Sequence, residues 1–489
     1  MKERRKRKAG RKAYGAGNPS GERHAKRKRV VGDATHCCGP HSCRDVKGQE
    51  VGGITPSLHI IQCESSAAPL SVKALEAAYL DASTEGRDTR DICGEAFAAL
   101  IYPMSVERFR EEFWEKKALV IHRPHLRDYY SDLYSTERIG RCLDEAKLCY
   151  TRDIDVTLYK EGKRFTLNGK SHNTAQASRV WELYKKDRCS VRVLHPQRFE
   201  NSLASYMAML EELWGSGAGS NAYLTPAGSQ GFAPHFDDVD AYVVQLEGKK
   251  RWNLYGHRCT SEILPRYSSP NFEQNEVEDF LLYQLLLQPG DLCYFPRGVI
   301  HQAKTEADAH SLHLTISTGC KHTWYDLLSL GVPMALDLAE REVVAMRRSM
   351  DWDIWRRLGI ARPDGEGTDR VRICGTILQL LNLLPDEFPV DAVADAFVQR
   401  HTMARLPPPL RTIGTTCDAD AEEESPTEVS PAEVSPTEES PDWSGAIRMV
   451  CSDAFRVHYE VNSATGSEEC VVYSHMRNEY KHHGEMETG

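Results

Sequence analysis

The stretch GFAPHFDDVDAYVVQLEGKKRWNLY, from Gly231 to Tyr255, places an ionisable pair beside a buried strand. His235 and Asp237 directly precede an apolar run in which Val243 and Leu246 indicate a strand that enters a hydrophobic core. Burying a charged or polar group is costly unless it has a partner. The pair therefore predicts a ligand site at the start of a β-strand.

A second motif, GDLCYFPRGVIH, supplies a partner for this pair. Five residues separate Gly290 from Pro296, and two separate Gly298 from His301. PGD and PRG are turn sequences on either side of a short strand, so His301 is expected on a rigid approach. Two imidazoles and one carboxylate can occupy one face of a metal and leave the other face open, which suits non-haem Fe(II). A closed zinc site would need a fourth protein ligand, usually a thiolate, and no cysteine is suitably placed.

Short segments rich in β-branched and aromatic residues surround both motifs. They are separated by Gly, Pro and Ser, which is typical of a β-sandwich or barrel. We expect strands at residues 119–121 and in CSVRVLHP, SNAYLTP, AYVVQLEG, RWNLY, DLCYFP and SLHLTIST. Helices are expected after Ser105, a plausible N-cap, and in NSLASYMAMLEELWG. The sequence therefore predicts a mainly β core with flanking helices.

This arrangement of motifs resembles a known family. The spacing from Gly290 to His301 matches the second motif of cupin barrels, and the chain from CSVRVLHPQRF to HSLHLTISTGCKHTWYD closely resembles the JmjC-domain ribosomal oxygenases. These are described as bifunctional lysine-specific demethylases and histidyl-hydroxylases. The resemblance is strong from about Phe113 to Leu330 and weaker beyond. It implies a cupin/JmjC double-stranded β-helix, a helical dimerisation segment and a C-terminal winged-helix-like module.

The resemblance also implies roles for individual residues. His235, Asp237 and His301 fall on the family's iron ligands, with 2-oxoglutarate and O2 as cosubstrates. The positions that match the family's peptide pocket are Arg192, Asn221, Tyr223 and Ser317. Each of these four could equally be an ordinary strand residue. His310 and His313 flank the last barrel strand, follow no glycine–proline turn, and are expected to be structural.

Lys250 falls on the family's lysine that pairs with the distal carboxylate of 2-oxoglutarate. Side-chain alternation supports this choice independently, because Lys250 and Trp252 share the apolar face of a strand, whereas Lys249 and Arg251 point away. An inward lysine needs an anionic partner, and a dicarboxylate cosubstrate supplies one. The alternative is a lysine at the barrel rim whose long side chain reaches water.

Charge and composition divide the chain into segments. Residues 1–32 hold thirteen Lys and Arg against two Glu, a charge of +11 (13 − 2), so the remaining residues carry −21 of the total of −10. We expect a mostly disordered basic region over 1–90, the JmjC domain over 91–330, the dimerisation segment over 331–388, and the winged-helix-like module over 389–489, interrupted at about 417–442 by an acidic repeat. The repeat, SPTEVSPAEVSPTEESP, is rich in proline and is not expected to pack.

The basic N-terminal arm predicts a location. KERRKRKAGRK and AKRKRV resemble a two-part nuclear import signal, and such arms also bind nucleic acid weakly without sequence preference. The nucleus, and the nucleolus in particular, is therefore expected. The sequence shows no secretory signal and no apolar run of about 18 residues, so we expect no membrane span. Fifteen scattered cysteines fit a reducing compartment, and HCCGPHSC matches zinc spacing poorly.

Three functions remain open. The first is hydroxylation of a histidine, or as a variant an arginine, in a ribosomal protein. The second is demethylation of a histone lysine, for example in the H3 tail, by the same iron chemistry. Against it, the sequence shows no aromatic cage that would hold a methylated lysine. The third is a non-catalytic cupin-type binding protein, against which the intact ligands and Lys250 argue. The C-terminal module is not strongly basic, which favours protein interaction over DNA reading.

Overall fold

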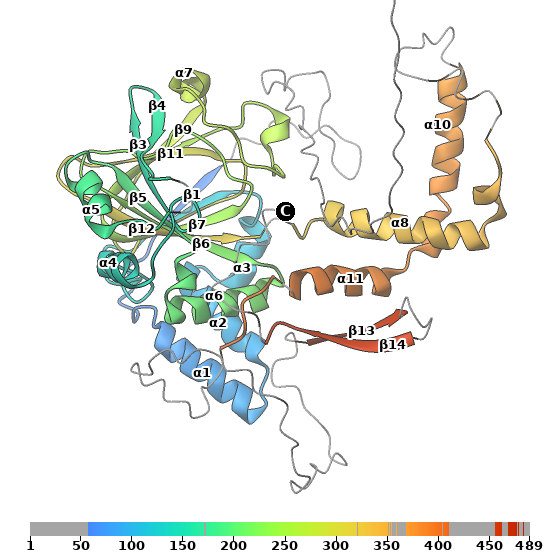
Figure 1. Ribbon diagram of the computed structural model, residues 1–489, viewed down its shortest axis with the longest axis horizontal. Coiled ribbons are helices and arrows are strands. Elements are labelled where there is room, and N and C mark those ends of the chain that lie inside the picture. The colour runs from blue at the N-terminus through green and yellow to red at the C-terminus, as the bar shows by residue number, and fades with distance from the viewer. Residues whose placement is uncertain are drawn as a thin grey trace, which may run out of the picture. The chain divides into compact units, whose positions relative to one another are not determined.

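Two β-sheets form the centre of the computed structural model (Figure 1). Their strands are β1 (Leu58–Gln62), β2 (Ala118–His122), β3 (Ile154–Lys160), β4 (Lys163–Thr166), β5 (Ser190–Leu194), β6 (Ala218–Thr225), β7 (Asp240–Gly248), β8 (Lys250–Tyr255), β9 (Leu281–Leu287), β10 (Leu292–Phe295), β11 (Ile300–Thr305) and β12 (Ser311–Thr318). The larger sheet has the order β1-β2-β10-β7-β12-β6-β5-β3-β4, and the smaller has the order β11-β8-β9. The structure describes residues 57–170, 173–319, 321–350, 368–402, 404–409, 455–461 and 468–476, and residues 352, 354, 358, 478 and 483.

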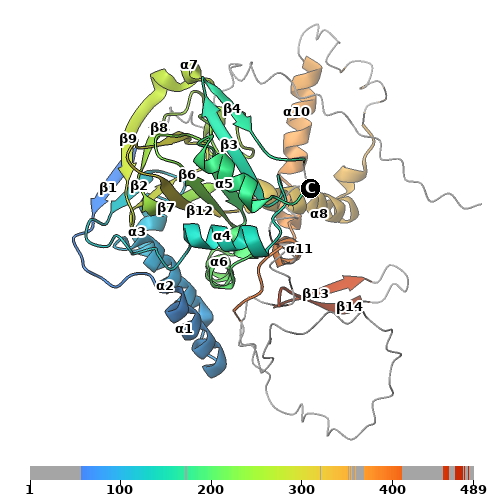
Figure 2. The ribbon, with the colours of Figure 1, turned by 60° about the vertical axis from the view of Figure 1, so that its left-hand side comes forward.

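Helices cover one face of the larger sheet. Those of the N-terminal two thirds are α1 (Val72–Glu85), α2 (Thr89–Ile101), α3 (Val106–Glu112), α4 (Thr136–Glu145), α5 (Ala177–Lys185), α6 (Asn201–Trp214) and α7 (Gln274–Val277). Figures 1 and 2 show α1, α2 and α6 grouped beneath the sheet. Ser105 caps α3 as the sequence predicts, because its side chain accepts a hydrogen bond from the Arg108 backbone N–H (3.3 Å).

Strand β7 is buried on both faces, which explains its continuous apolar run. Tyr242 and Val244 pack into the core that the helices share with the larger sheet. Ala241 and Val243 pack instead against Trp252 of β8, in the interior between the two sheets. Because alternate residues of a strand point to opposite faces, the two cores divide β7 between them. The predicted mainly β core with flanking helices is confirmed.

The ordered domain begins earlier than the predicted boundary after residue 90. Strand β1 pairs in parallel with β2, from Leu58 opposite Ala118 onward, and Tyr79 of α1 is buried in the main core. Local sequence patterns show little sign of this pairing, since the partner strand lies about sixty residues away and β1 is only five residues long. The basic arm and HCCGPHSC lie outside the described residues.

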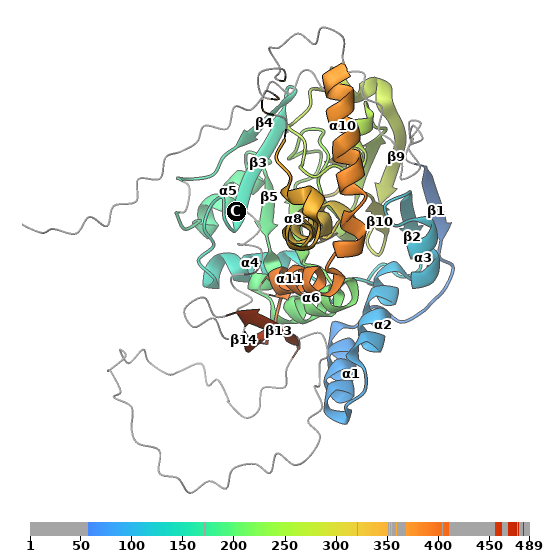
Figure 3. The same cartoon turned by 90° about the vertical axis from the view of Figure 1, so that its right-hand side faces the viewer.

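The C-terminal third contributes α8 (Trp324–Glu342), α10 (Thr368–Leu381), α11 (Val390–Thr402) and an antiparallel pair, β13 (Phe455–Val461) and β14 (Glu468–Ser474). Figure 3 shows α8, α10 and α11 facing the viewer. Glu211 of α6 joins this region to the core, because it accepts hydrogen bonds from the Leu406 backbone N–H (2.7 Å) and from His483 Nε2 (2.8 Å). The winged-helix and dimerisation assignments stay predictions. The acidic repeat lies outside the described residues.

Within the described ranges, no helix combines the length and the apolar character that crossing a bilayer requires.

Candidate metal centre

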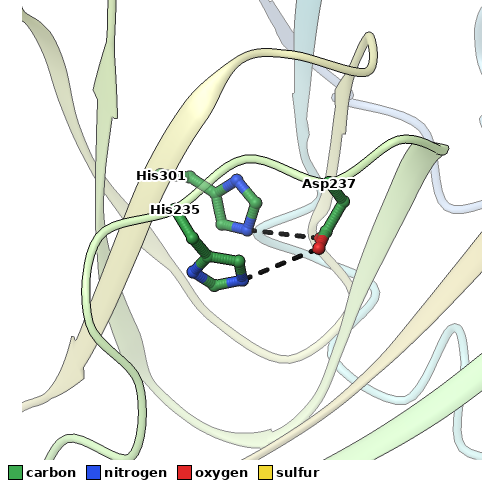
Figure 4. Close-up of side chains that lie close together, drawn as sticks. All are labelled: His235, Asp237 and His301. Carbon is green, nitrogen blue, oxygen red and sulfur yellow. Dashed lines mark ion pairs between the residues drawn. The ribbon is translucent and has the colours of Figure 1, made fainter. Parts of the chain in front are cut away.

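His235, Asp237 and His301 form a cluster of three possible metal ligands (Figure 4). His235 Nε2 lies 3.7 Å from Asp237 Oδ1, and His301 Nε2 lies 3.7 Å from Asp237 Oδ2. All the ligand atoms lie within 4.8 Å of one another. It is the one such cluster of three or more among the residues that the structure describes. The two sequence motifs therefore meet at one point, as their pattern predicts.

Backbone pairing brings the two histidines together. His301 donates its backbone N–H to the His235 carbonyl (2.8 Å), and His235 donates to the His301 carbonyl (3.2 Å). The Gly298 N–H donates in turn to the carbonyl of Asp237 (3.0 Å). These bonds join main-chain atoms only. The backbone segments that carry the three candidate ligands are therefore held together whatever their side chains are.

Glycine is required at two positions of the second motif. Gly290 and Gly298 have φ values of +87° and +88°, in the left-handed region that favours glycine. A Cβ on Gly298 would lie 2.0 Å from the Glu262 carbonyl oxygen, and one on Gly290 would lie 2.1 Å from that of Leu126. Glycine therefore allows tight turns on either side of β10. The second of these turns places His301 at the site.

Arg297, in the turn before His301, forms an ion pair with the first residue of β7. It is 7% exposed and pairs with the buried Asp240 (3.0 Å) and with Glu115. Tyr294 also donates to Asp240 (3.2 Å). Since Asp240 is the first residue of β7, this network links the His301 turn to the His235–Asp237 segment.

Hydrogen bonds leave the Nε2 atoms of both histidines free for a metal. Nδ1 of His235 lies 2.9 Å from the Ala233 carbonyl, and Nδ1 of His301 lies 3.0 Å from the Val299 carbonyl. A carbonyl only accepts, so Nδ1 carries the proton in each ring and Nε2 presents its lone pair toward Asp237. Burial, and then the charge of His235, lower the pKa of His301 to about 4, so it is neutral at physiological pH.

The donor set fits Fe(II) with part of its coordination sphere open. Two imidazoles and a carboxylate from one face are the facial arrangement of non-haem iron oxygenases. No cysteine lines the cavity among the described residues, so the thiolate of a closed zinc site is missing there. The cavity has a volume of about 200 Å³, and Trp252 and Phe295 form part of its wall.

Lys250 lies in the same cavity and has no carboxylate partner in the described part of the chain. It is 5% exposed, and its Nζ donates to Thr225 Oγ1 (3.2 Å). Lys249 points away and pairs with Asp308 (2.8 Å). The alternation inferred from the sequence therefore agrees with the structure. A buried ammonium that has a hydroxyl as neighbour fits the binding of one carboxylate of 2-oxoglutarate.

Affinity for 2-oxoglutarate is expected to fall as the pH rises above about 7. Burial lowers the pKa of Lys250 to about 7 in the free protein, and a bound carboxylate would raise it. Binding above about pH 7 then takes up a proton, at a cost of up to about tenfold in affinity per pH unit. Calorimetric titration without oxygen, with Mn(II) in the metal site, measures this dependence. An affinity that stays constant from about pH 7 to about pH 9 would contradict it.

The four predicted substrate residues lie on neighbouring barrel strands. Arg192 and Tyr223 line the cavity with the three metal ligands. Asn221 lies two residues from Tyr223 along β6, and its Oδ1 is buried without a hydrogen-bond partner in the structure. Ser317 is further along the barrel and donates to the Gly219 carbonyl (3.3 Å). Arg192 also forms an ion pair with Asp155, which is the contact expected if it were an ordinary strand residue. Their roles toward a substrate stay predictions.

The cavity has three further lining residues that were not assigned to the site from the sequence. His313, expected to be structural, lines the cavity, where its ring stacks on Tyr223 at 4.8 Å and its Nδ1 is buried without a partner. Phe232 and Arg164 also line the cavity, and the Arg164 guanidinium lies 4.4 Å from the Phe232 ring. His310, in contrast, bonds to Glu247 (3.2 Å) and does not line the cavity.

Known proteins resemble this chain in the same region. A family model described as a JmjC domain matches residues 192–327. The zebrafish (Danio rerio) protein named Ribosomal oxygenase 1 is 39% identical over 376 residues, which make up 76% of this chain and 68% of that protein. The mosquito (Culex quinquefasciatus) protein named Bifunctional lysine-specific demethylase and histidyl-hydroxylase NO66 is 38% identical over 72% of this chain and 53% of that protein. The solved structure of Escherichia coli ribosomal oxygenase YcfD aligns with 61% of this chain and 72% of that one, at 18% identity and a TM-score of 0.37.

The β-helix core and its centre of two histidines and one carboxylate define a JmjC domain of the class that uses Fe(II) and 2-oxoglutarate. The likeness to the zebrafish protein is more specific, and it shows that the chain belongs to the ribosomal oxygenase family. The chain spans about half the length of two mosquito relatives, which are the Culex protein (53%) and the protein of the same name from Aedes aegypti (50%).

Proposed function

We propose that this protein is an Fe(II)- and 2-oxoglutarate-dependent oxygenase that hydroxylates a histidine side chain of a ribosomal protein. The observation that carries the proposal is the cluster of His235, Asp237 and His301 in one cavity with the buried Lys250, which has no acidic partner among the described residues. Family membership supports it, since relatives bear the names ribosomal oxygenase and histidyl-hydroxylase. A non-catalytic cupin-type binding protein would not need this combination of an open ligand set and a buried cation.

Each group in the cavity has a distinct task in this function. Bound iron, with 2-oxoglutarate and O2, supplies the oxidant for a C–H bond. His235, Asp237 and His301 hold the metal, and Lys250 binds and orients the distal carboxylate of the cosubstrate. Packed aromatic rings beside the metal site exclude water. Arg192 and Tyr223, on paired strands, are placed to orient the target side chain.

Mass spectrometry of ribosomal proteins tests the proposal. Ribosomes from cells with and without the gene are compared for the mass of one added oxygen atom. We expect one histidine to lose this modification when the gene is absent, and to regain it only with an intact metal centre. A modified arginine instead would identify an arginyl hydroxylase. Identical ribosomal proteins in both cell lines would overturn the proposal.

A second candidate is demethylation of a histone lysine. The names of the mosquito relatives include lysine-specific demethylase, and the same oxidation of an N-methyl group would release it as formaldehyde. The same pair of cell lines distinguishes the candidates, because this activity predicts a gain of histone lysine methylation, for example on the H3 tail, when the gene is absent.

A homodimer is part of the proposal. Large apolar side chains are exposed on two C-terminal helices, with Trp324 of α8 at 80% and Val371 of α10 at 73% exposure. Leu328 and Leu336 of α8 and Leu378 of α10 are exposed too. Burying such side chains in a subunit interface would stabilise a dimer, and light scattering of the full chain measures the mass.

We propose a nuclear, and specifically nucleolar, location that depends on the basic arm. The charge of +11 (13 − 2) over residues 1–32 is the support for it, and such a segment would also contact nucleic acid weakly. Deleting residues 1–32 is expected to move the protein to the cytoplasm while its turnover rate in vitro stays unchanged. Fluorescence microscopy of the tagged full and shortened chains measures this. Nuclear accumulation of the shortened chain would show that the signal lies elsewhere.

A further inference from the structure

Arg164 places on the cavity wall a positive charge that forms no ion pair with the described residues. It lies on β4, at the end of the larger sheet, and its guanidinium lies 4.4 Å from the Phe232 ring. Its Nε is buried without a hydrogen-bond partner, and no ion pair joins it to any carboxylate of the described chain. Arg192 differs, because it pairs with Asp155. Burial, and then the charge of Arg192, lower the pKa of Arg164 by more than the nearby Asp155 raises it.

The aromatic rings of the cavity do not form an empty cage for a cation. A methylated ammonium is usually held by free faces of aromatic rings. The aromatic side chains of this cavity already contact other rings or cations: Tyr223 contacts His313, Phe232 contacts Arg164, Trp252 contacts His313, and Phe295 contacts His301. A cationic target side chain would therefore meet rings that already have partners, with the Arg164 guanidinium on one of them.

The cavity also lacks a free carboxylate. Asp237 is the only acidic residue among the described residues of its lining, and it is a metal ligand. With cofactor and cosubstrate bound, the charges of Fe(II) and Lys250 balance those of Asp237 and the two carboxylates of 2-oxoglutarate. Asp155 is already occupied by Arg192 and by Asn168 Nδ2 (2.7 Å). The positive charge of Arg164 is therefore not balanced when Fe(II) and 2-oxoglutarate are bound.

We propose that Arg164 is a specificity-determining residue that excludes cationic target side chains, methylated lysine among them, and admits neutral ones such as histidine. The inference rests on the proposed function, because it concerns the side chain that enters the same cavity. It also selects between the two candidate activities. Repulsion between like charges in a partly solvated cavity is expected to weaken binding of the cation by about tenfold.

The test compares two residues that differ only in charge. Heptapeptide libraries are prepared with a fixed central residue, which is trimethyl-lysine in one and its uncharged carbon isostere in the other. A third library, with central histidine, serves as reference. Retention on the full-length protein is measured by mass spectrometry, with Fe(II) and 2-oxoglutarate present and oxygen absent. Variants Arg164→Met and Arg164→Lys separate charge from shape. Lys163→Met removes an exposed cation from the same hairpin that does not line the cavity.

The wild-type protein, Arg164→Lys and Lys163→Met should retain the isostere about tenfold better than trimethyl-lysine, and Arg164→Met should retain both about equally. Equal retention by the wild-type protein would overturn the proposal. So would an Arg164→Met variant that still discriminates, or an Arg164→Lys variant that does not. Failure of the proposed function is a separate result. It would appear as no oxidation of the histidine library when oxygen is admitted, whatever the ratio of retention between the trimethyl-lysine and isostere libraries.

Discussion

Replacing Asp237 with alanine is expected to abolish turnover of 2-oxoglutarate while the protein stays folded. Asp237 offers an oxygen 3.7 Å from the Nε2 atom of each histidine, so its loss removes the only carboxylate of the centre. Removing a group that merely orients a ligand typically costs roughly 10- to 100-fold in metal affinity or activity. Loss of the ligand itself should therefore cost more than about 100-fold.

The fold should survive this substitution because the bonds that place the segment are made by the backbone. The Asp237 carbonyl accepts from the Gly298 N–H whatever its side chain. A matched control is Asp238→Ala, since Asp238 bonds to Ser268 Oγ (2.6 Å) and does not line the cavity. Succinate release, iron binding and thermal unfolding are measured for both variants. Full turnover in Asp237→Ala, or an equal loss in Asp238→Ala, would contradict the assignment.

Replacing Lys250 with alanine is expected to weaken the binding of 2-oxoglutarate by roughly 30-fold or more. The Lys250 ammonium is buried beside Thr225, so the carboxylate that it binds is desolvated together with it. Removing one partner of such a charge pair typically costs about 2–5 kcal/mol. Iron binding should persist, because Lys250 is not among the metal ligands.

Lys249 provides the matched control for this prediction. It precedes Lys250 directly, but it is partly exposed and pairs with Asp308 (2.8 Å) on the outside of the barrel. Lys249→Ala should leave the affinity within about threefold of wild type, since exposed ion pairs contribute little. Titration of 2-oxoglutarate against each variant measures the difference. Equal losses at both positions, or a loss only at Lys249, would show that the cosubstrate lies elsewhere.

That His235, Asp237 and His301 lie together could be predicted from the sequence because short-range patterns determine it. His235 and Asp237 are two residues apart, and two tight turns with glycine at positive φ hold the approach of His301. The inward direction of Lys250 could be predicted by alternation within one strand, and Lys250 and Trp252 are both buried, with the exposed Arg251 between them. In each case the decisive pattern lies within a dozen residues.

The remainder of the cavity depends on contacts between distant parts of the chain. His313 reaches the cavity because β12 pairs with both β6 and β7, which places it opposite Tyr223. Arg164 lies on a four-residue strand whose sequence, KRFT, resembles an exposed loop. The early start of the domain has the same cause, because β1 is held by its pairing with β2. Local patterns do not show which distant strands will be neighbours.

The most direct test of the account follows an oxygen atom from O2 into a histidine. The full chain, with Fe(II) and 2-oxoglutarate, is incubated with ribosomal proteins from cells that lack the gene, under isotopically heavy O2. The account predicts one heavy oxygen atom on a histidine side chain, formed together with succinate and lost in Asp237→Ala. Succinate formation that ribosomal protein does not stimulate, with no labelled histidine, would contradict it.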